Sequence, residues 1–270
     1  MALTPRPSFK TLFTDEAKSR RNRPAAGMFL SSGDAGIAEI VAGAGMDYLL
    51  IDAEHSPLSL ESVQDQLRAI AGYDPIPMVR IPENNTTLIK QYLDLGAQSL
   101  LVPMIFTPDD ARKAAAAVAY PPEGVRGIGS ALARSGAWGR YPNYLTTARE
   151  TITLTIQIET AEALEHLDEI LAVDGIDGIF IGPSDLSASM GYLGQQTHPE
   201  VVKAAKTVIA KAKDAGLFAG VNAFNPEQAQ DYVDAGADFV NVGADVALLA
   251  RAAEELAAKW TSSETETTSY

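Results

Sequence analysis

Three ionisable side chains follow a run of aliphatic residues in the segment LLIDAEHSPLS, residues 49–59. Asp52, Glu54 and His55 are separated only by Ala53, at a point where a buried strand would normally end in a turn of Gly, Asn or Pro. Two carboxylates beside an imidazole can hold and move a proton, which suits general-base catalysis. We therefore expect His55 to be catalytic, with Asp52 orienting its ring or raising its basicity.

Further polar residues stand at or just beyond the ends of other apolar runs, namely Arg80, Gln157, Glu159, Ser184, Asp185 and Asn222. If Glu159 and Asp185 lie close together, their carboxylates either share a proton or neutralise a cation, for which a hard divalent ion such as Mg2+ or Mn2+ is suited. The alternative is that each acid caps a helix or lies in its first turn. Arg80 can pair with Glu54, bind a carboxylate or developing oxyanion, or do both.

The other basic side chains fit simpler roles. His166 falls within a predicted helix and His198 precedes a proline, where it can help to start a helix. The lysines all fall in predicted helices or in the N-terminal segment, and none falls on a predicted strand. This placement argues against Schiff-base chemistry, which needs a lysine inside the fold.

Short apolar runs that alternate with alanine-rich amphipathic stretches must position these side chains. Several of the runs are continuously apolar, as expected for a parallel sheet that is buried on both faces. Eight such runs, with no G-x-G-x-x-G motif after the first, favour an α/β fold of the (β/α)8 TIM-barrel type over a doubly wound sheet. The expected strands are 26–30, 48–51, 77–81, 99–103, 153–158, 178–181, 218–222 and 239–242.

The remaining segments complete this organisation. We expect one domain over residues 1–260 and a flexible polar tail over 261–270. Glycines that precede several expected strands are typical of helix C-caps; they are Gly45, Gly96, Gly216 and Gly236. The long connection 120–144, YPPEGVRGIGSALARSGAWGRYPNY, is expected to lie over the mouth of the barrel, because long loops in compact domains are usually functional.

Composition excludes several classes of function. The formal charge of −14 argues against binding to nucleic acid or to an anionic membrane surface. No apolar run approaches the roughly 18 residues needed to span a bilayer. The chain has no cysteine, and its start, MALTPRPSFK, lacks the apolar core of a secretory signal. We therefore expect a cytoplasmic enzyme or binding protein.

Several stretches between about residues 25 and 260 resemble the HpcH/HpaI aldolases, a family of metal-dependent class II enzymes. The most specific are GVRGIGSALAR and GPSDLSASMGYLG, with AGAGMDYLLIDAEHSP, MVRIPENN and IQIET in support. The similarity extends to members that act on 4-hydroxy-2-oxoheptanedioate or 2-dehydro-3-deoxyglucarate. It implies reversible cleavage of a 4-hydroxy-2-oxo acid to pyruvate and an aldehyde, through a metal-stabilised pyruvate enolate.

The resemblance also implies roles around the metal. Glu159 and Asp185 match the two protein ligands of a divalent ion, which can be Mg2+, Mn2+ or Co2+. Gln157 and Ser184 match positions that line the pyruvate site.

The same resemblance assigns the acid–base and binding groups. His55 matches the catalytic base, with Asp52 and Glu54 in its supporting network, and Arg80 matches the arginine that holds the keto or enolate oxygen. Asp94 corresponds to an acid that reaches a neighbouring subunit's site in relatives. A homo-hexamer whose C-terminal helix is exchanged between subunits is implied in the same way.

Three positions depart from the family pattern. Ala53 stands where relatives have glycine, and we expect its extra methyl group to be tolerated. Phe29 stands where relatives often have tryptophan, and Asn222 where an apolar residue is usual. Both would face the aldehyde, which predicts a more polar acceptor.

Two other functions remain open at this stage. A citramalyl- or malyl-CoA-type lyase of the same superfamily would need basic residues for CoA, which Arg126, Arg134 and Arg140 can supply. A non-catalytic barrel that only binds a metal or an oxo acid is the other alternative. The joint presence of the histidine, arginine and acidic residues described above argues against it.

Overall fold

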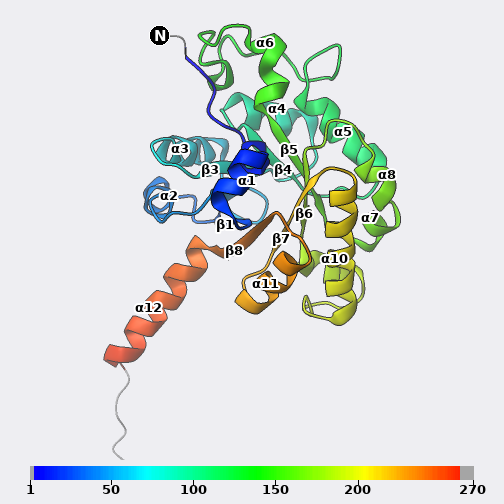
Figure 1. Cartoon of the computed structure of the whole chain (residues 1–270). Coiled ribbons are helices and arrows are strands. Elements are labelled where there is room, and N and C mark those ends of the chain that lie inside the picture. Colours follow the sequence, from blue (N-terminus) through cyan, green and yellow to red (C-terminus); the bar gives the residue numbers. More distant parts are fainter. Residues whose placement is uncertain (1–2, 262–270) are drawn as a thin grey trace, which may run out of the picture.

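The computed structural model describes residues 3–261 and contains eight parallel strands that close into a barrel, with β8 paired to β1 (Figure 1). The predicted TIM barrel is therefore confirmed, and each expected strand lies within two residues of its predicted bounds. The strands are β1 (Ala25–Leu30), β2 (Tyr48–Asp52), β3 (Ile76–Arg80), β4 (Ser99–Val102), β5 (Thr153–Ile158), β6 (Gly178–Ile181), β7 (Phe218–Asn222) and β8 (Phe239–Ala244).

Helices surround the barrel, and many of them have a side chain that caps the first turn. Ser59 and Thr107 each form a capping box, with Ser62 and Asp110 respectively. The four glycines predicted to follow helices all have positive φ, as a C-terminal cap requires. The helices are α1 (Asp15–Arg21), α2 (Ala35–Ala42), α3 (Leu60–Ile70), α4 (Thr86–Asp94), α5 (Pro108–Val118), α6 (Tyr144–Thr147), α7 (Ala161–Glu165), α8 (Leu167–Leu171), α9 (Pro183–Ser189), α10 (Pro199–Asp214), α11 (Pro226–Asp234) and α12 (Asp245–Thr261), with 3-10 helices η1 (Phe9–Phe13), η2 (Arg134–Gly136) and η3 (Ala148–Thr151).

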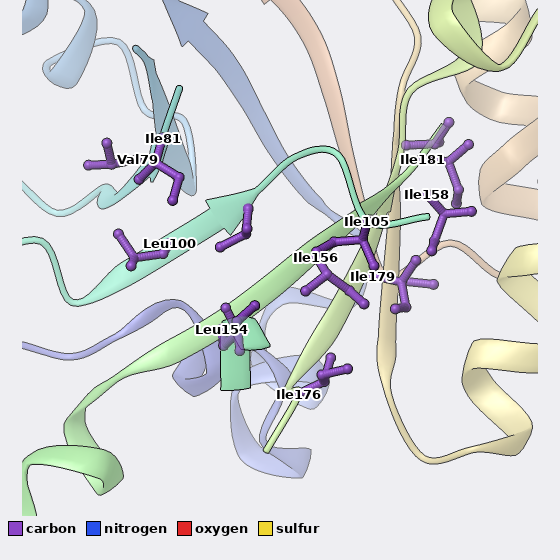
Figure 2. Packing of buried hydrophobic residues seen from close by; sticks show 14 of the residues in the cluster. Val79, Ile81, Leu100, Ile105, Leu154, Ile156, Ile158, Ile176, Ile179 and Ile181 are labelled. Carbon is purple, nitrogen blue, oxygen red and sulfur yellow. The ribbon is translucent and has the colours of Figure 1, made fainter. Parts of the chain in front are cut away.

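Alternation along each strand divides the buried side chains between two cores. On β5, Leu154, Ile156 and Ile158 belong to the aliphatic layer between the strands and the helices, part of which Figure 2 shows. Thr155 and Gln157 occupy the alternate positions and therefore face the barrel interior. The same alternation on the other strands decides which polar residues at the strand ends point into the barrel.

The N-terminal end of the barrel is closed by an aromatic plug, which consists of Phe9, Phe13, Tyr48, Phe180, Phe218 and Phe239. The Phe9 ring lies 5.0 Å from the rings of both Tyr48 and Phe239. Its backbone N–H donates to the Ser99 hydroxyl at 2.9 Å, so η1 is held against the inward residues of the strands. Gly220 leaves room for the plug, because a Cβ there would overlap the Phe239 ring.

The C-terminal helix α12 extends away from the barrel (Figure 1). Its first residue, Asp245, anchors it by accepting hydrogen bonds from the backbone N–H groups of Ser31 and Ser32 at 2.8 and 3.1 Å. Large apolar side chains beyond this anchor are exposed, among them Leu248, Leu249, Leu256 and Trp260. Residues 262–270 of the predicted flexible tail lie outside the described residues. No helix within residues 3–261 is both long and apolar enough to cross a membrane.

The prediction that the long connection 120–144 covers the barrel mouth is wrong. The connection leaves α5 and returns to the start of β5, so it lies at the N-terminal end of the strands. There Arg134 Nη1 donates to the Leu95 carbonyl oxygen at 3.4 Å, and Gln98 Nε2 donates to the Thr151 carbonyl oxygen at 3.3 Å. In a (β/α)8 barrel only strand-to-helix connections cover the active end, and this one runs from a helix to a strand.

Candidate active site

The first part of the site is a pair of neighbouring strand ends. Asp52 and Arg80 are the last residues of β2 and β3 and are direct partners in the sheet register. Arg80 Nε donates to Asp52 Oδ1 at 2.9 Å, and Arg80 Nη1 lies 3.1 Å from Glu54 Oε2. The Arg80 guanidinium carbon also lies 4.9 Å from the centroid of the Phe29 ring on β1. Arg80 is only 7% exposed, so two carboxylates and one ring face hold its cation in a fixed place.

The turn after β2 is organised by the Asp52 carboxylate. Asp52 Oδ1 accepts hydrogen bonds from the backbone N–H groups of Glu54 and His55 at 3.2 and 3.3 Å. Asp52 therefore contacts the main chain of His55, whereas we expected it to contact the ring. The ring nitrogen Nε2 instead lies 3.5 Å from Glu54 Oε2, and the imidazole side chain is 62% exposed. His55 thus lies at an open face of the site, where it can reach a bound molecule.

The other histidines lie elsewhere. His198 precedes α10, and its Nδ1 accepts the Glu200 backbone N–H at 3.3 Å, as predicted for a residue that starts a helix. His166 lies at the junction of α7 and α8, and its Nδ1 is 3.8 Å from Glu169 Oε1. His55 is therefore the histidine that the fold brings to the strand ends.

Glu159 and Gln157 form a buried pair at the end of β5. Gln157 is fully buried and its Nε2 donates to Glu159 Oε2. Glu159 Oε1 accepts the backbone N–H of Met104 at 3.0 Å, and Met104 has a φ of +61°, which is uncommon for a residue other than glycine. Glu159 is only 4% exposed and does not cap α7, because Thr160 does so. The helix-cap reading of Glu159 is therefore wrong.

Asp185 and Ser184 occupy the first turn of α9, immediately after β6. Both side chains are exposed. Asp185 is an acid in the first turn of a helix, which confirms the alternative given for it above. This position still leaves its carboxylate free to face the strand ends. The Ser184 hydroxyl donates to Gln196 Oε1 at 2.7 Å.

The pKa of Glu54 reflects the charged groups that surround it. The pKa of Glu54 is raised to about 7, mainly by burial; Arg80 lowers it, and the neighbouring carboxylates of Glu159, Asp52 and Asp185 contribute to the rise. The charge of Glu54 is thus influenced by three other carboxylates and by the Arg80 guanidinium. A second positive charge would relieve this repulsion.

The donor set fits a divalent cation that a bound substrate completes. Within residues 3–261 no group of three or more His, Cys, Asp or Glu side chains is placed to hold a metal ion by itself. Glu159 and Asp185 offer two carboxylates, and Mg2+ sites in enzymes commonly combine one or two carboxylates with water and substrate oxygens. The buried Gln157 Oε1 has no hydrogen-bond partner among the described residues. This oxygen is therefore free to accept a hydrogen bond from a bound molecule.

The residues predicted to face the aldehyde lie on β1 and β7, two further strands of the barrel mouth. Phe29 is 7% exposed, and its ring centroid is 6.3 Å from that of Phe224. Asn222 ends β7, and its Oδ1 accepts the Asn241 side-chain N–H at 3.5 Å, while Asn241 Oδ1 is buried without a hydrogen-bond partner among the described residues. This side of the mouth therefore combines an aromatic wall with two amides.

Sequence reasoning missed three contributors to the site. The Met104 amide and the Phe224 ring lie on loops, and Asn241 lies on β8 among apolar neighbours. A main-chain donor has no residue-type signal. Phe224 and Asn241 could have been found from their position at or just beyond a strand, by the same rule that selected Asn222.

Asp94 lies away from this site, at the end of α4. It forms an ion pair with Arg126 at 2.8 Å, and the Arg126 side chain is fully buried. Arg126, Arg134 and Arg140 all belong to the long connection at the N-terminal end of the strands. In a single chain none of these arginines is positioned to hold a CoA group at the barrel mouth.

Comparisons with known proteins identify the family of this chain. The model of the family described as HpcH/HpaI aldolase/citrate lyase matches residues 25–252. A 4-hydroxy-2-oxo-heptane-1,7-dioate aldolase of Salmonella heidelberg (strain SL476) is 49% identical over 251 residues, which cover 93% of this chain and 95% of that protein. The protein of the same name from Shigella sonnei (strain Ss046) is 49% identical over 245 residues, covering 91% and 94% of the two chains.

A solved structure extends the comparison to three dimensions. The HpcH/HpaI aldolase/citrate lyase family protein from Burkholderia cenocepacia J2315 superposes with a TM-score of 0.85 at 38% identity. The match covers 92% of this chain and all of that one. Fold and sequence thus point to the same group of proteins.

Proposed function

We propose a specific reaction for this chain, which belongs to the HpcH/HpaI aldolase/citrate lyase family and is an aldolase, a carbon–carbon lyase. The proposed enzyme is cytoplasmic and metal-dependent, and it cleaves a 4-hydroxy-2-oxo acid to pyruvate and an aldehyde. One observation carries the proposal. Arg80 is held by Asp52 and Glu54 beside the open imidazole of His55, and Glu159 and Asp185 stand close enough to raise the pKa of Glu54.

The metal assignment follows from the two remaining acids. Glu159 and Asp185 would hold Mg2+, Mn2+ or Co2+, and members of this family generally depend on a divalent ion. When bound, the ion acts as a Lewis acid that polarises the keto group of the substrate. Gln157 fixes one oxygen of Glu159 and the Met104 amide fixes the other, so this ligand is held in place before the ion binds.

The chain's own residues supply the proton transfer and the charge stabilisation. In the cleavage direction His55 accepts the proton of the C4 hydroxyl, directly or through a water, as the C3–C4 bond breaks and the aldehyde leaves. The electrons of that bond form the enolate of pyruvate, whose negative charge develops on the C2 oxygen. Arg80 donates to that oxygen, and because two carboxylates already hold its guanidinium, little reorganisation is needed. Return of the proton from His55 to C3 completes pyruvate.

The substrate is proposed to be a dicarboxylic 4-hydroxy-2-oxo acid, since the relatives at 49% identity are named for 4-hydroxy-2-oxo-heptane-1,7-dioate. Ser184 and Gln157 would line the pyruvate part. Phe29 and Asn222 would face the aldehyde part, and the nearby Asn241 amide makes this side more polar than an all-apolar wall.

We also propose that several copies of the chain assemble. The exposed apolar side chains of α12, such as Leu249 and Trp260, would be covered by a second copy of the chain if this helix is exchanged in a homo-hexamer. Asp94 lies at the end of the barrel opposite its own site, so any catalytic role it has must be in a neighbouring subunit.

Exchange of the pyruvate methyl protons in D2O, followed by NMR, tests the reaction without knowledge of the aldehyde. We expect exchange with Mg2+ that EDTA abolishes and that His55→Ala slows by about 10²- to 10⁴-fold. The matched control His166→Ala should exchange at the wild-type rate, because His166 lies at the α7–α8 junction. Absence of exchange with Mg2+, Mn2+ and Co2+ alike would overturn the proposal.

A further inference from the structure

A second cavity lies at the end of the barrel opposite the active site. It has a volume of about 230 Å³. Its walls come from the N-terminal segment, α3, the start of β3, the connection between α4 and β4, and the long connection that follows α5. These segments meet at the N-terminal ends of the strands, so the cavity shares no residue with the active site.

Three guanidinium groups line this cavity, from Arg6, Arg134 and Arg140, and no acidic side chain does. Among the described residues none of the three forms an ion pair with a carboxylate, whereas Arg23 and Arg126 do. In a chain with a formal charge of −14, such a group of unpaired cations is unexpected. Arginine with no carboxylate partner inside a cavity is typical of an anion site.

Neutral carbonyl groups hold these arginines in place without cancelling their charge. Arg6 Nη2 donates to the Tyr73 carbonyl oxygen at 2.9 Å, and Arg140 Nε donates to the Ala137 carbonyl oxygen at 2.8 Å. Arg134 lies against Gly96, where any Cβ would overlap its guanidinium. Each guanidinium carries five N–H groups, so most of their donors remain available for a ligand.

Two further observations favour a negative group in the cavity. Burial lowers the pKa of Arg134, and the neighbouring cations Arg68 and Arg6 lower it further. The Ser135 hydroxyl, which also lines the cavity, is buried and has no hydrogen-bond partner among the described residues. A bound anion would relieve the repulsion and could accept from this hydroxyl.

We propose that this cavity is a binding site for a small dianion with carboxylate or phosphate oxygens. The planar guanidinium fork matches both kinds of oxygen pair, so the chemistry is shared between a dicarboxylate and inorganic phosphate. A volume of about 230 Å³ accommodates molecules of this size. The ligand would contact both the N-terminal segment and η2. The long connection that contains η2 also carries Arg126, which pairs with Asp94.

Isothermal titration calorimetry with inorganic phosphate and with succinate, at constant ionic strength, tests the proposal. We expect Arg134→Gln/Arg140→Gln to weaken the binding of at least one of these dianions by tenfold or more. Arg20→Gln/Arg112→Gln, which removes the same charge from exposed positions elsewhere, should bind as the wild type does. Arg80→Lys should also retain this binding, which separates the cavity from the active site.

Fluorescence gives a local readout that does not depend on heats of binding. The chain has two tryptophans, and Trp138 lines the cavity while Trp260 lies on α12. In a Trp260→Phe background, the dianion should change the Trp138 emission with the same midpoint as the calorimetric titration, whereas acetate should not. Equal binding by the cavity variant and its control, or binding that is lost only in Arg80→Lys, would overturn the proposal.

Discussion

The two ends of the barrel are built from the same eight strands and the same alternation of side chains, but they are filled differently. At the N-terminal end the inward positions carry the aromatic plug, in which Phe239 is fully buried and its ring stacks with that of Phe180 at 5.9 Å. At the C-terminal end the inward positions carry Asp52, Arg80 and Gln157; Arg80 donates to Asp52, and Gln157 donates to Glu159. One end is packed with aromatic side chains, and the other holds charged groups that are largely buried.

This difference shows which end of the fold tolerates an energetically unfavourable arrangement of charges. Burying carboxylates beside one another is unfavourable, and the raised pKa of Glu54 is the sign of it. The barrel can carry this arrangement because the opposite end contributes hydrophobic burial, with η1 closing it against solvent. Substitutions at the two ends should therefore separate stability from activity.

The largest expected effect is on stability, at the plug. Phe239→Ala should lower the free energy of unfolding by about 3–5 kcal/mol, because it leaves a cavity among Phe9, Tyr48 and Phe180. The folded variant should keep a near-wild-type kcat/KM, as the plug does not touch the active site. Phe224→Ala, at the mouth, is the matched control and should change stability little, because Phe224 is 48% exposed. Equal destabilisation by the two variants would contradict the comparison.

The next effect is on activity, at the other end. Arg80→Lys should lower the rate of pyruvate methyl exchange by about 10²-fold, about 2.7 kcal/mol, because an ammonium group cannot hold Asp52 and Glu54 together and still present a fixed donor. Arg68→Lys, in an exposed pair with Asp65, is the control and should leave exchange unchanged. An Arg80→Lys enzyme with wild-type exchange would show that this cation does not stabilise the enolate.

The sequence was enough to predict the barrel, because its signals are local and repeated. Continuous apolar runs such as Tyr48–Ile51 mark strands buried on both faces, and positive-φ glycines such as Gly96 end the helices between them. Polar residues at the ends of these runs then fall on one end of the barrel by topology alone. This rule places Asp52, Arg80 and Gln157 at the end of the barrel that carries the candidate site.

Contacts that depend on backbone direction could not be predicted in this way. The Asp52 carboxylate binds the main chain of His55, which sequence spacing cannot distinguish from a contact with the ring. The Met104 amide that holds Glu159 carries no residue-type signal. The long connection was placed at the wrong end because its composition suggested function, whereas its position between a helix and a strand fixes its place.

The smallest effect concerns the cost of the charged end itself. The pKa of Glu54, about 7, lies above its usual value of 4.5, so between these values the folded state binds more protons than the unfolded state. The free energy of unfolding therefore falls as the pH rises from 4.5 through 7. In metal-free protein, Glu54→Gln should remove this loss of stability. After allowance for solvent screening, we expect a gain of about 1 kcal/mol at pH 8, which raises the unfolding temperature by about 2–4 °C. The rise at pH 5 should be smaller. Glu123→Gln, at an exposed position, should have no such pH dependence. A lower unfolding temperature for Glu54→Gln at pH 8 would mean that the ion pair with Arg80 outweighs the burial, and the charged end would then contribute stability as the plug does.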